Sequence, residues 1–282
     1  MSSKRLDASW TAWLEENIRR GCNAEELLGI LLANAFDIRS IRTTMGRHFP
    51  AQSPMALAAE GLADPVDYHA IANVRLTRAT SGAVRFTTEK MQLYTLDAFM
   101  TAEECDEIVA LINPTLRPST VTIQSCDKAF RTSRTSDLSL LDSAVVSQLD
   151  EKIAATLGIR PSYSEGIQAQ RYDVGGEFKQ HTDYFEPGTT EYAQHAALRG
   201  NRTWTFMVYL NDVESGGATR FFALDHAFAP LKGMAVVWNN LRPDGTVNPD
   251  TAHAGARIDA GHKIIITKWF RECGIGSMQY DD

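Results

Sequence analysis

A histidine and an aspartate two positions apart, His181 and Asp183, are the pair of residues in this sequence with the clearest capacity for chemistry. They follow the Gly175-Gly176 turn, and residues i and i+2 of an extended strand point to the same side. Both side chains could therefore reach one metal ion. The pair alone is weak support, because a chain with seven histidines and 35 acidic residues brings such neighbours together by chance as solvated surface groups.

A third ligand for the same ion is available in His253, which lies beyond several expected strands. Two neutral imidazoles and one carboxylate on one face of an octahedron form the ligand set of non-haem Fe(II) sites, which leaves the remaining positions open for other molecules. Zinc accepts the same ligands, but a hydrolytic zinc site normally needs a nearby general base. No such base stands out beside these residues in the sequence.

A lysine at the start of an apolar strand, Lys263, is the next candidate. In the stretch KIIITKWF, strict alternation puts Lys263, Ile265, Thr267 and Trp269 on one face. If Ile265 and Trp269 face the core, the ammonium group faces it too. A lysine inside a β core needs an anionic partner, and a dicarboxylate molecule could supply one. The alternative is a solvated lysine at a strand end.

The part of the chain that must position these residues is rich in β-strands. After Pro161, short apolar stretches are separated by glycine pairs, and this pattern predicts strands. The predicted strands are 167–172, 203–210, 219–223, 234–238 and 263–270. Because they are short and do not alternate with helices, they favour an antiparallel sandwich or barrel within an α+β fold.

The chain before these strands is mainly helical. Thr101 and Glu104 form a capping box for a helix over 103–112, which follows a strand at 91–99, and apolar residues four apart predict another helix over 143–157. Helical spacing also marks three stretches near the N-terminus, around 10–18, 23–36 and 38–45. We therefore predict a helical N-terminal region over 1–75 and a main domain over 76–282.

Three longer segments occur in an order and spacing typical of one enzyme family. They are 168–185 (QAQRYDVGGEFKQHTDYF), 200–222 (GNRTWTFMVYLNDVESGGATRFF) and 253–271, with shorter pieces at 96–106 and 131–133. Together they resemble the prolyl 4-hydroxylase-like branch of the Fe(II)/2-oxoglutarate-dependent dioxygenases. The resemblance implies a double-stranded β-helix (jelly-roll) core with flanking helices.

Carried over position by position, the resemblance implies roles for six residues. His181, Asp183 and His253 would bind Fe(II). Lys263 would pair with the distal carboxylate of 2-oxoglutarate, to which Tyr172 and Thr205 would offer hydroxyl groups. An ammonium group with a hydroxyl donor binds a carboxylate better than either group alone. Dioxygen would be the second cosubstrate, and ascorbate is left open as an accessory reductant.

The resemblance also suggests residues on the substrate side. Trp269 resembles the family's aromatic residue near the substrate, and Phe178 occupies a position where the family often has tyrosine. Glu165, Arg271 and Arg131 are further candidates for substrate contacts. For Glu165 and Arg271 the alternative is a surface charge at a strand end, and for Arg131 it is the anchoring of a loop.

The activity implied by the resemblance is hydroxylation of an unactivated C–H bond. We expect a free cyclic amino acid of the proline or pipecolate type as the substrate, because the chain is acidic and compact and lacks the tyrosine at Phe178. Arg131 or Arg271 would then bind the substrate carboxylate and Glu165 its ammonium group. The alternatives are peptidyl-prolyl 4-hydroxylation of a peptide or protein and a non-catalytic binding or scaffold protein that keeps the fold. The intact metal and lysine positions count against the scaffold.

Composition narrows the partners and the location. Of the 282 residues, 44% are apolar and 22% are charged, as in ordinary globular proteins, and the net charge of −7 does not favour nucleic acid or anionic membranes as partners. The N-terminus lacks the apolar stretch of a signal peptide, and the longest apolar run, 27–36, is shorter than a membrane span. The four cysteines form no CxxC pair, so we expect reduced thiols and a cytoplasmic protein. The sequence makes no prediction of an oligomeric state.

Overall fold

The computed structural model describes residues 4–61, 65–78, 82–119, 131–141, 143–196 and 199–279. Its helices are α1 Ala8–Arg19, α2 Ala24–Ala33, α3 Ile38–Met45, α4 Pro54–Ala59, α5 Tyr68–Ala72, α6 Ala102–Ile112, α7 Ala144–Leu157 and α8 Thr190–His195. Its strands are β1 Val84–Arg85, β2 Leu93–Leu96, β3 Arg117–Pro118, β4 Arg134–Asp137, β5 Gln168–Tyr172, β6 Phe178–His181, β7 Arg202–Tyr209, β8 Ser215–Gly216, β9 Thr219–Phe221, β10 His226–Phe228, β11 Ala235–Asn239, β12 His253–Gly255, β13 Ile258–Ala260 and β14 Lys263–Arg271.

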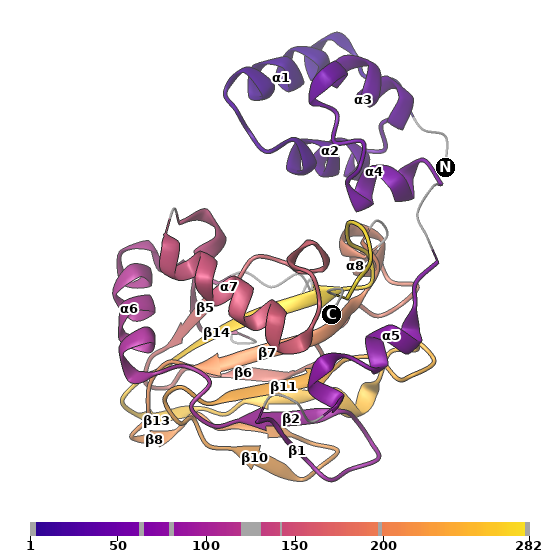
Figure 1. Cartoon of the computed structure of the whole chain (residues 1–282). Coiled ribbons are helices and arrows are strands. Elements are labelled where there is room, and N and C mark those ends of the chain that lie inside the picture. The colour runs from indigo at the N-terminus through magenta and orange to yellow at the C-terminus, as the bar shows by residue number, and fades with distance from the viewer. Residues whose placement is uncertain are drawn as a thin grey trace.

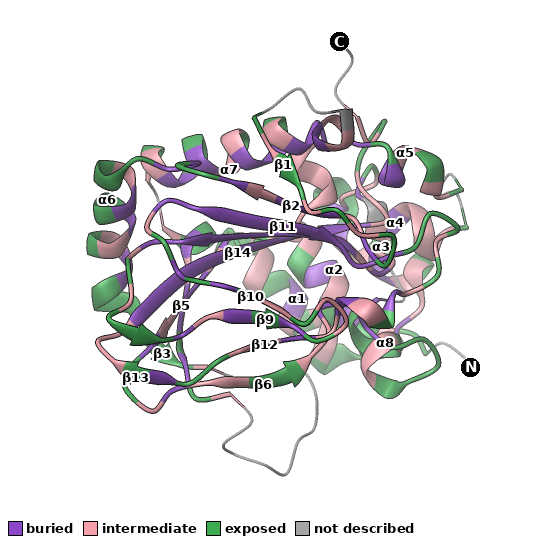
Figure 2. Ribbon diagram, turned by 90° about the horizontal axis from the view of Figure 1, so that it is seen from below, coloured by how far each residue is buried: buried purple, intermediate pink, exposed green. Residues whose placement is uncertain are grey.

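The described strands form two main antiparallel sheets. The larger has eight strands in the order β1-β2-β11-β7-β14-β5-β4-β3, and the smaller has four in the order β10-β9-β12-β6 (Figure 2). A further short pair, β8 and β13, lies beside them. Helices α6 and α7 lie beside the larger sheet (Figure 1). The predicted α+β fold with a jelly-roll core is confirmed.

The alternation of side chains along the central strands divides the core into two layers. On β7, Trp204, Phe206 and Val208 belong to the cluster that includes the apolar residues of α6 and α7. Met207 and Tyr209 belong instead to the cluster between the two sheets. Because successive residues of a strand point to opposite faces, each central strand contributes to both layers. The residues between the sheets are the ones that can line an internal site.

The predicted elements agree with the structure to different degrees. The five strands predicted after Pro161 correspond to β5, β7, β9, β11 and β14 with ends within two residues, and the capping box of Thr101 and Glu104 opens α6. The strand predicted at 91–99 is the shorter β2. The short strands β6 and β12 were not predicted, because each has too few residues to show an alternating pattern.

The N-terminal residues form a separate group of helices. Apolar residues of α1 to α3, together with Phe36, Phe49 and Ala56, share a core of their own, and these helices gather in one lobe in Figure 1. Ile71, Val74 and Leu76 instead belong to the core of the larger sheet. The division of the chain into domains therefore stays a proposal, and these contacts favour a boundary before α5.

Two further sequence expectations can be compared with the structure. Cys22, Cys105 and Cys273 form no disulfide, whereas Cys126 lies outside the described residues. Among the described residues, no helix combines the length and the apolar character that crossing a membrane requires.

Candidate active site

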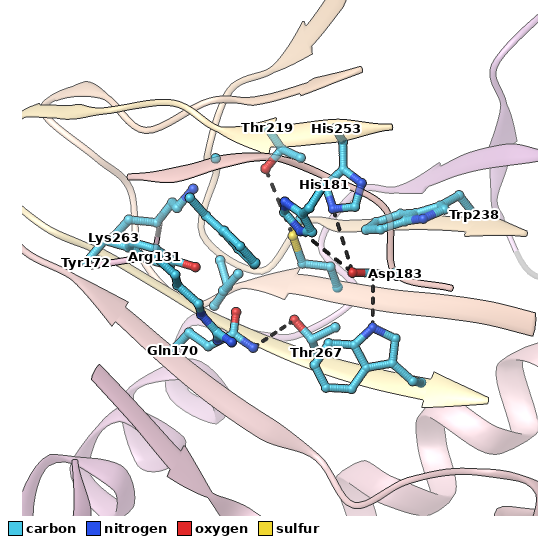
Figure 3. A pocket seen from close by; sticks show the side chains of 15 residues that line it. Arg131, Gln170, Tyr172, His181, Asp183, Thr219, Trp238, His253, Lys263 and Thr267 are labelled. Carbon is cyan, nitrogen blue, oxygen red and sulfur yellow. Dashed lines mark hydrogen bonds and ion pairs between the residues drawn. The ribbon is translucent and has the colours of Figure 1, made fainter. Parts of the chain in front are cut away.

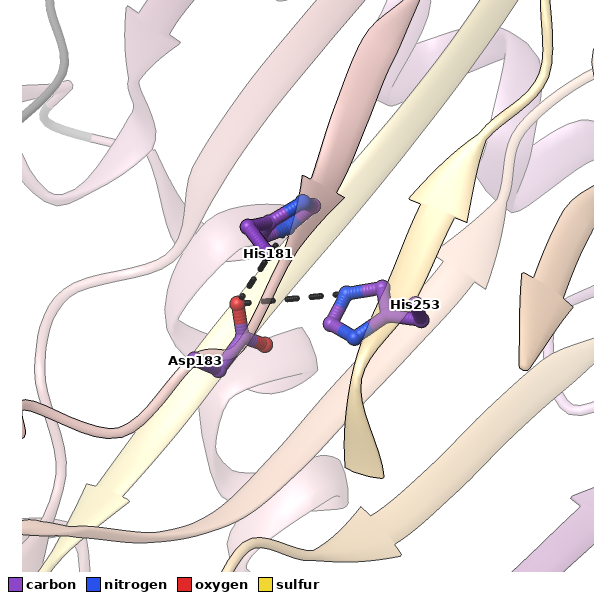
Figure 4. Close-up of side chains that lie close together, drawn as sticks. All are labelled: His181, Asp183 and His253. Carbon is purple, nitrogen blue, oxygen red and sulfur yellow. Dashed lines mark ion pairs between the residues drawn. The ribbon is translucent and has the colours of Figure 1, made fainter. Parts of the chain in front are cut away.

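The two histidines predicted as metal ligands come from neighbouring strands of the smaller sheet. His181 ends β6 and His253 begins β12, and the antiparallel pairing places their Cα atoms opposite each other. Asp183 follows two residues after β6. Its Oδ1 lies 3.7 Å from Nε2 of His181 and 4.0 Å from Nε2 of His253, so three donor atoms converge on one point (Figure 4). In the part of the chain that the structure describes, this is the one such group of histidine, cysteine and acidic side chains.

Backbone carbonyl groups orient both imidazole rings. Nδ1 of His181 lies 2.7 Å from the Lys179 carbonyl oxygen, and Nδ1 of His253 lies 3.0 Å from that of Thr251. A carbonyl can only accept, so Nδ1 carries the proton and Nε2 keeps its lone pair for a metal. Burial, followed by the proximity of His253, lowers the pKa of His181 to about 3. The His181 ring is therefore neutral at pH 7, as a metal ligand must be.

Two donors hold one oxygen of the aspartate. Oδ2 of Asp183 accepts hydrogen bonds from the Thr205 hydroxyl at 2.8 Å and from Nε1 of Trp269 at 2.9 Å. The other oxygen, Oδ1, is the one that faces the two Nε2 atoms. This neutral-imidazole and carboxylate donor set suits Fe(II) with open positions.

A buried lysine lies in the same cavity as the three ligands. Lys263 is 1% exposed, and its Nζ donates to the Gly217 carbonyl at 2.8 Å and lies 5.1 Å from the centre of the Tyr172 ring (Figure 3). In the described parts of the chain no carboxylate lies within ion-pair distance of it. Burial lowers the pKa of Lys263 to about 8. A buried ammonium group without a carboxylate partner is suited to binding an anion from solution.

Residues 167–271, which contain all four of these side chains, match the sequence profile of the 2OG-Fe(II) oxygenase superfamily. This chain contains a 2OG-Fe(II) oxygenase domain. Fe(II) and 2-oxoglutarate are the metal and cosubstrate of that family, and the donor set and the buried lysine fit both.

Similar proteins place the oxygenase domain within the prolyl 4-hydroxylase-like branch. The chain is 34% identical to mouse prolyl 4-hydroxylase subunit alpha-3 over 181 residues, which cover 62% of this chain and 33% of that subunit. It is 30% identical to the probable prolyl 4-hydroxylase 10 of Arabidopsis thaliana, covering 61% of this chain and 66% of the relative. The chain thus spans about a third of the length of the first curated relatives it matches.

A solved structure shares the fold of the oxygenase domain. The viral collagen prolyl hydroxylase from Paramecium bursaria Chlorella virus-1, in a 2-oxoglutarate complex, superposes with a TM-score of 0.51 at 24% identity. The match covers 64% of this chain and 94% of the viral one. The likeness supports the jelly-roll assignment of the core.

Thr205 of the oxygenase domain does not have the surroundings that the sequence predicted for it. The prediction gave its hydroxyl to 2-oxoglutarate, but that hydroxyl donates to Asp183 and accepts from the Asn240 amide at 2.9 Å. Thr205 is also not among the residues that line the lysine's cavity, whereas Thr219 and Tyr172 are. The sequence reasoning overlooked Thr219, although it closes the Gly216-Gly217-Ala-Thr turn whose carbonyl binds Lys263.

A second cavity, of about 440 Å³, shares His181 and Asp183 with the lysine's cavity. Phe178, Trp269 and Arg131 line it, but Phe178 and Trp269 line the lysine's cavity as well, so the substrate-side role of these residues stays a prediction. The Phe178 ring stacks on the His181 ring at 3.5 Å between centres, and the Arg131 guanidinium covers Phe178 at 4.9 Å. Arg131 also lines the lysine's cavity, so it stands between the two spaces.

Glu165 and Arg271 are already paired, which corrects the roles predicted for them. Glu165 accepts two hydrogen bonds of 2.7 Å from Arg202 and one of 2.8 Å from Arg271. Burial opposes ionisation, but the two arginines hold the pKa of Glu165 at about 2. Arg271 further donates to the carbonyl groups of His195 and Gly200. Neither residue is free to bind the ammonium or carboxylate group of an amino acid, and the central residue, Arg202, was not predicted.

Proposed function

We propose that this chain hydroxylates prolyl residues within a peptide or protein substrate, with Fe(II), 2-oxoglutarate and dioxygen. The observation that carries the proposal is one cavity in which a preoriented His181–Asp183–His253 set lies together with the buried Lys263, and a second cavity that also borders His181 and Asp183. The choice of proline rests on the similarity to proteins named prolyl 4-hydroxylases.

The metal ligands and the lysine of the cavity then have specific tasks. His181, Asp183 and His253 would hold Fe(II), which supplies the activation of dioxygen coupled to decarboxylation of 2-oxoglutarate. Lys263 binds the distal carboxylate of the cosubstrate, and the Gly217 carbonyl and the Tyr172 ring keep its ammonium group in place. Because Lys263 is only 1% exposed, the ion pair with the cosubstrate forms in a medium of low dielectric constant, which strengthens it.

The shape of the substrate side favours a polypeptide over a free amino acid. The cavity of about 440 Å³ shares Ser139, Glu165 and Gly166 with a neighbouring open hollow of about 400 Å³ along α7. Two adjoining hollows offer room for residues beside a target proline. Two of the three charged anchors expected for a free amino acid, Glu165 and Arg271, bind each other, which leaves only Arg131 of the three.

The test offers proline-containing peptides and free proline or pipecolate in parallel to the protein with Fe(II), 2-oxoglutarate and air. We expect succinate to form together with a peptide heavier by one oxygen atom, and neither product with His181→Ala. Oxygen addition to the free imino acids alone would overturn the peptide substrate. An absence of succinate with every substrate would overturn the oxygenase activity itself.

A further inference from the structure

An uninterrupted series of contacts leads from a buried ion pair to the metal-binding carboxylate. Nε1 of Trp269 donates to Oδ2 of Asp183 at 2.9 Å. The Arg202 guanidinium lies 4.0 Å from the centre of the Trp269 ring. The same guanidinium lies 4.9 Å from the centre of the Phe185 ring, and its Nη1 donates a long hydrogen bond of 3.5 Å to the Asp183 backbone carbonyl. The indole that orients Asp183 is therefore itself held by a stacked cation.

The stacked arginine has little freedom to move. Two parallel hydrogen bonds of 2.7 Å join Arg202 to Glu165, and Arg271 binds the same carboxylate at 2.8 Å. The Arg202 side chain is only 16% exposed. A two-point arginine–carboxylate pair fixes the plane of the guanidinium as well as its position. The plane matters here, because stacking on an indole depends on it.

The number of oxygens that Asp183 offers decides how many positions around the metal stay open. A carboxylate can bind through one oxygen or through both. With two imidazoles and one oxygen, three positions of an octahedron remain, enough for a cosubstrate that chelates through two atoms and for dioxygen. If Oδ2 also bound the metal, one of those positions would be lost. The hydrogen bonds of Trp269 and Thr205 compete for Oδ2.

We propose that Arg202 is a positioning residue that acts through Trp269 to keep Asp183 a one-oxygen ligand. From the proposed function, the inference takes only the assumption that His181, Asp183 and His253 bind a metal ion. It concerns metal binding and is independent of which substrate is hydroxylated. Thr205 is the second donor to Oδ2 and does not depend on Arg202, so it supplies a matched comparison.

The test measures Co(II) affinity and the Co(II) absorption spectrum, as a probe of coordination, in the full chain without substrate. We expect Arg202→Met and Trp269→Phe each to weaken Co(II) binding about tenfold, the lower end of the range for residues that orient metal ligands. In a Trp269→Phe background, Arg202→Met should cause little further loss of Co(II) affinity. In the double variant of Arg202→Met and Thr205→Val, by contrast, the two losses of affinity should add in full. Arg202→Lys, which keeps the charge without the plane, should behave as Arg202→Met does. Arg220→Met, which removes an exposed arginine paired with Asp225, should leave Co(II) binding unchanged.

Several outcomes would overturn the proposal. They are full additivity of Arg202→Met with Trp269→Phe, wild-type Co(II) affinity in both Arg202 variants, and an unchanged absorption spectrum in Trp269→Phe. If Arg202→Met does not fold, Arg202→Lys is tested instead, in the Trp269→Phe and Thr205→Val backgrounds. The proposed function fails separately, when the wild-type protein binds Co(II) through His181 but oxidises no substrate.

Discussion

Individual side chains of this site are held in their reactive form by burial and by a few hydrogen bonds. The imidazole rings keep Nε2 free because carbonyl groups accept their Nδ1 protons. Lys263 is held by one carbonyl and one aromatic ring without a carboxylate. Burying an ion costs several kcal/mol, so this ammonium group is stabilised fully only when an anion arrives. Cosubstrate binding should therefore follow the protonation of Lys263.

Binding of 2-oxoglutarate should weaken at alkaline pH. Burial lowers the pKa of Lys263 from 10.5 to about 8. Below that pH the amine is charged, and the dissociation constant of 2-oxoglutarate should not change with pH. Above it, the dissociation constant should rise, approaching about tenfold per pH unit, because the neutral amine must first gain a proton. Titration calorimetry from about pH 7 to about pH 9.5 measures this. Lys263→Arg should remove the pH dependence, and a flat wild-type profile would contradict the assignment.

The two threonines near the metal should separate cosubstrate binding from metal binding. Thr219 lines the lysine's cavity, and its hydroxyl accepts from Tyr209 at 2.7 Å while its own proton makes only a weak 4.0 Å contact with the Met207 sulfur and can turn to the cosubstrate. The Thr205 hydroxyl instead donates to Asp183. A hydrogen bond to a charged group is worth about 1.5–3 kcal/mol, so Thr219→Val should weaken 2-oxoglutarate binding about tenfold and leave metal affinity unchanged. Thr205→Val should weaken metal binding and leave 2-oxoglutarate binding unchanged. Equal effects of both variants on both ligands would show that the two hydroxyl groups do not have separate tasks.

At the level of elements, the site depends on how short strands pair and turn. β12 lies between β9 and β6, which brings His253 opposite His181. The turn before β9 carries Gly216 and Gly217, both with positive φ, and the Gly217 carbonyl binds Lys263. A side chain at Gly216 would place its Cβ 2.2 Å from the Arg257 carbonyl oxygen. Backbone proximity therefore requires glycine at this corner.

Gly216→Ala should be much more destabilising than Gly21→Ala, although both residues have similar φ, +81° and +76°. At Gly21 nothing lies within 4 Å of an added Cβ, so the cost there is the strain of the left-handed backbone, about 1 kcal/mol. At Gly216 the collision with backbone adds about 1–3 kcal/mol. Chemical denaturation of both variants measures the difference, and equal losses would mean that the corner can shift freely. Weaker binding of 2-oxoglutarate should accompany Gly216→Ala, because the Lys263 contact moves with the turn.

On the scale of the whole molecule, the oxygenase core and the N-terminal helices have separate apolar interiors, and α5 belongs to the oxygenase side. Nε1 of the buried Trp204 donates to the Ile71 carbonyl at 2.9 Å, and the Tyr68 hydroxyl donates to Glu272 at 3.0 Å. These bonds join α5 to β7 and to the residue that follows β14, the two central strands that also border the site. The boundary predicted at residue 75 would cut through this contact.

Two truncations test where the oxygenase domain begins. Removing residues 1–61 should change the midpoint of thermal unfolding by about 2 °C or less, because the core of the larger sheet stays whole. Removing residues 1–75 also takes away Ile71 and Val74, which are 2% and 0% exposed. Each such side chain contributes about 1.5–3 kcal/mol, so the midpoint should fall by about 10 °C. Equal losses in the two truncations would place the boundary elsewhere.

The sequence alone determined which chemistry this protein could host. Side-chain alternation is a local property of a strand, so eight consecutive letters predicted that Lys263, Ile265, Thr267 and Trp269 share one face, and the structure shows that this face lines the cavity. The spacing of His181 and Asp183 was equally local. Only the tertiary structure decided which side chains contact one another. The pairing of β6 with β12, the hydrogen bond of Thr205 to Asp183 and the enclosure of Glu165 by two arginines join residues distant in the chain. Such contacts depend on how strands are ordered in a sheet, and no local pattern of residues encodes that order.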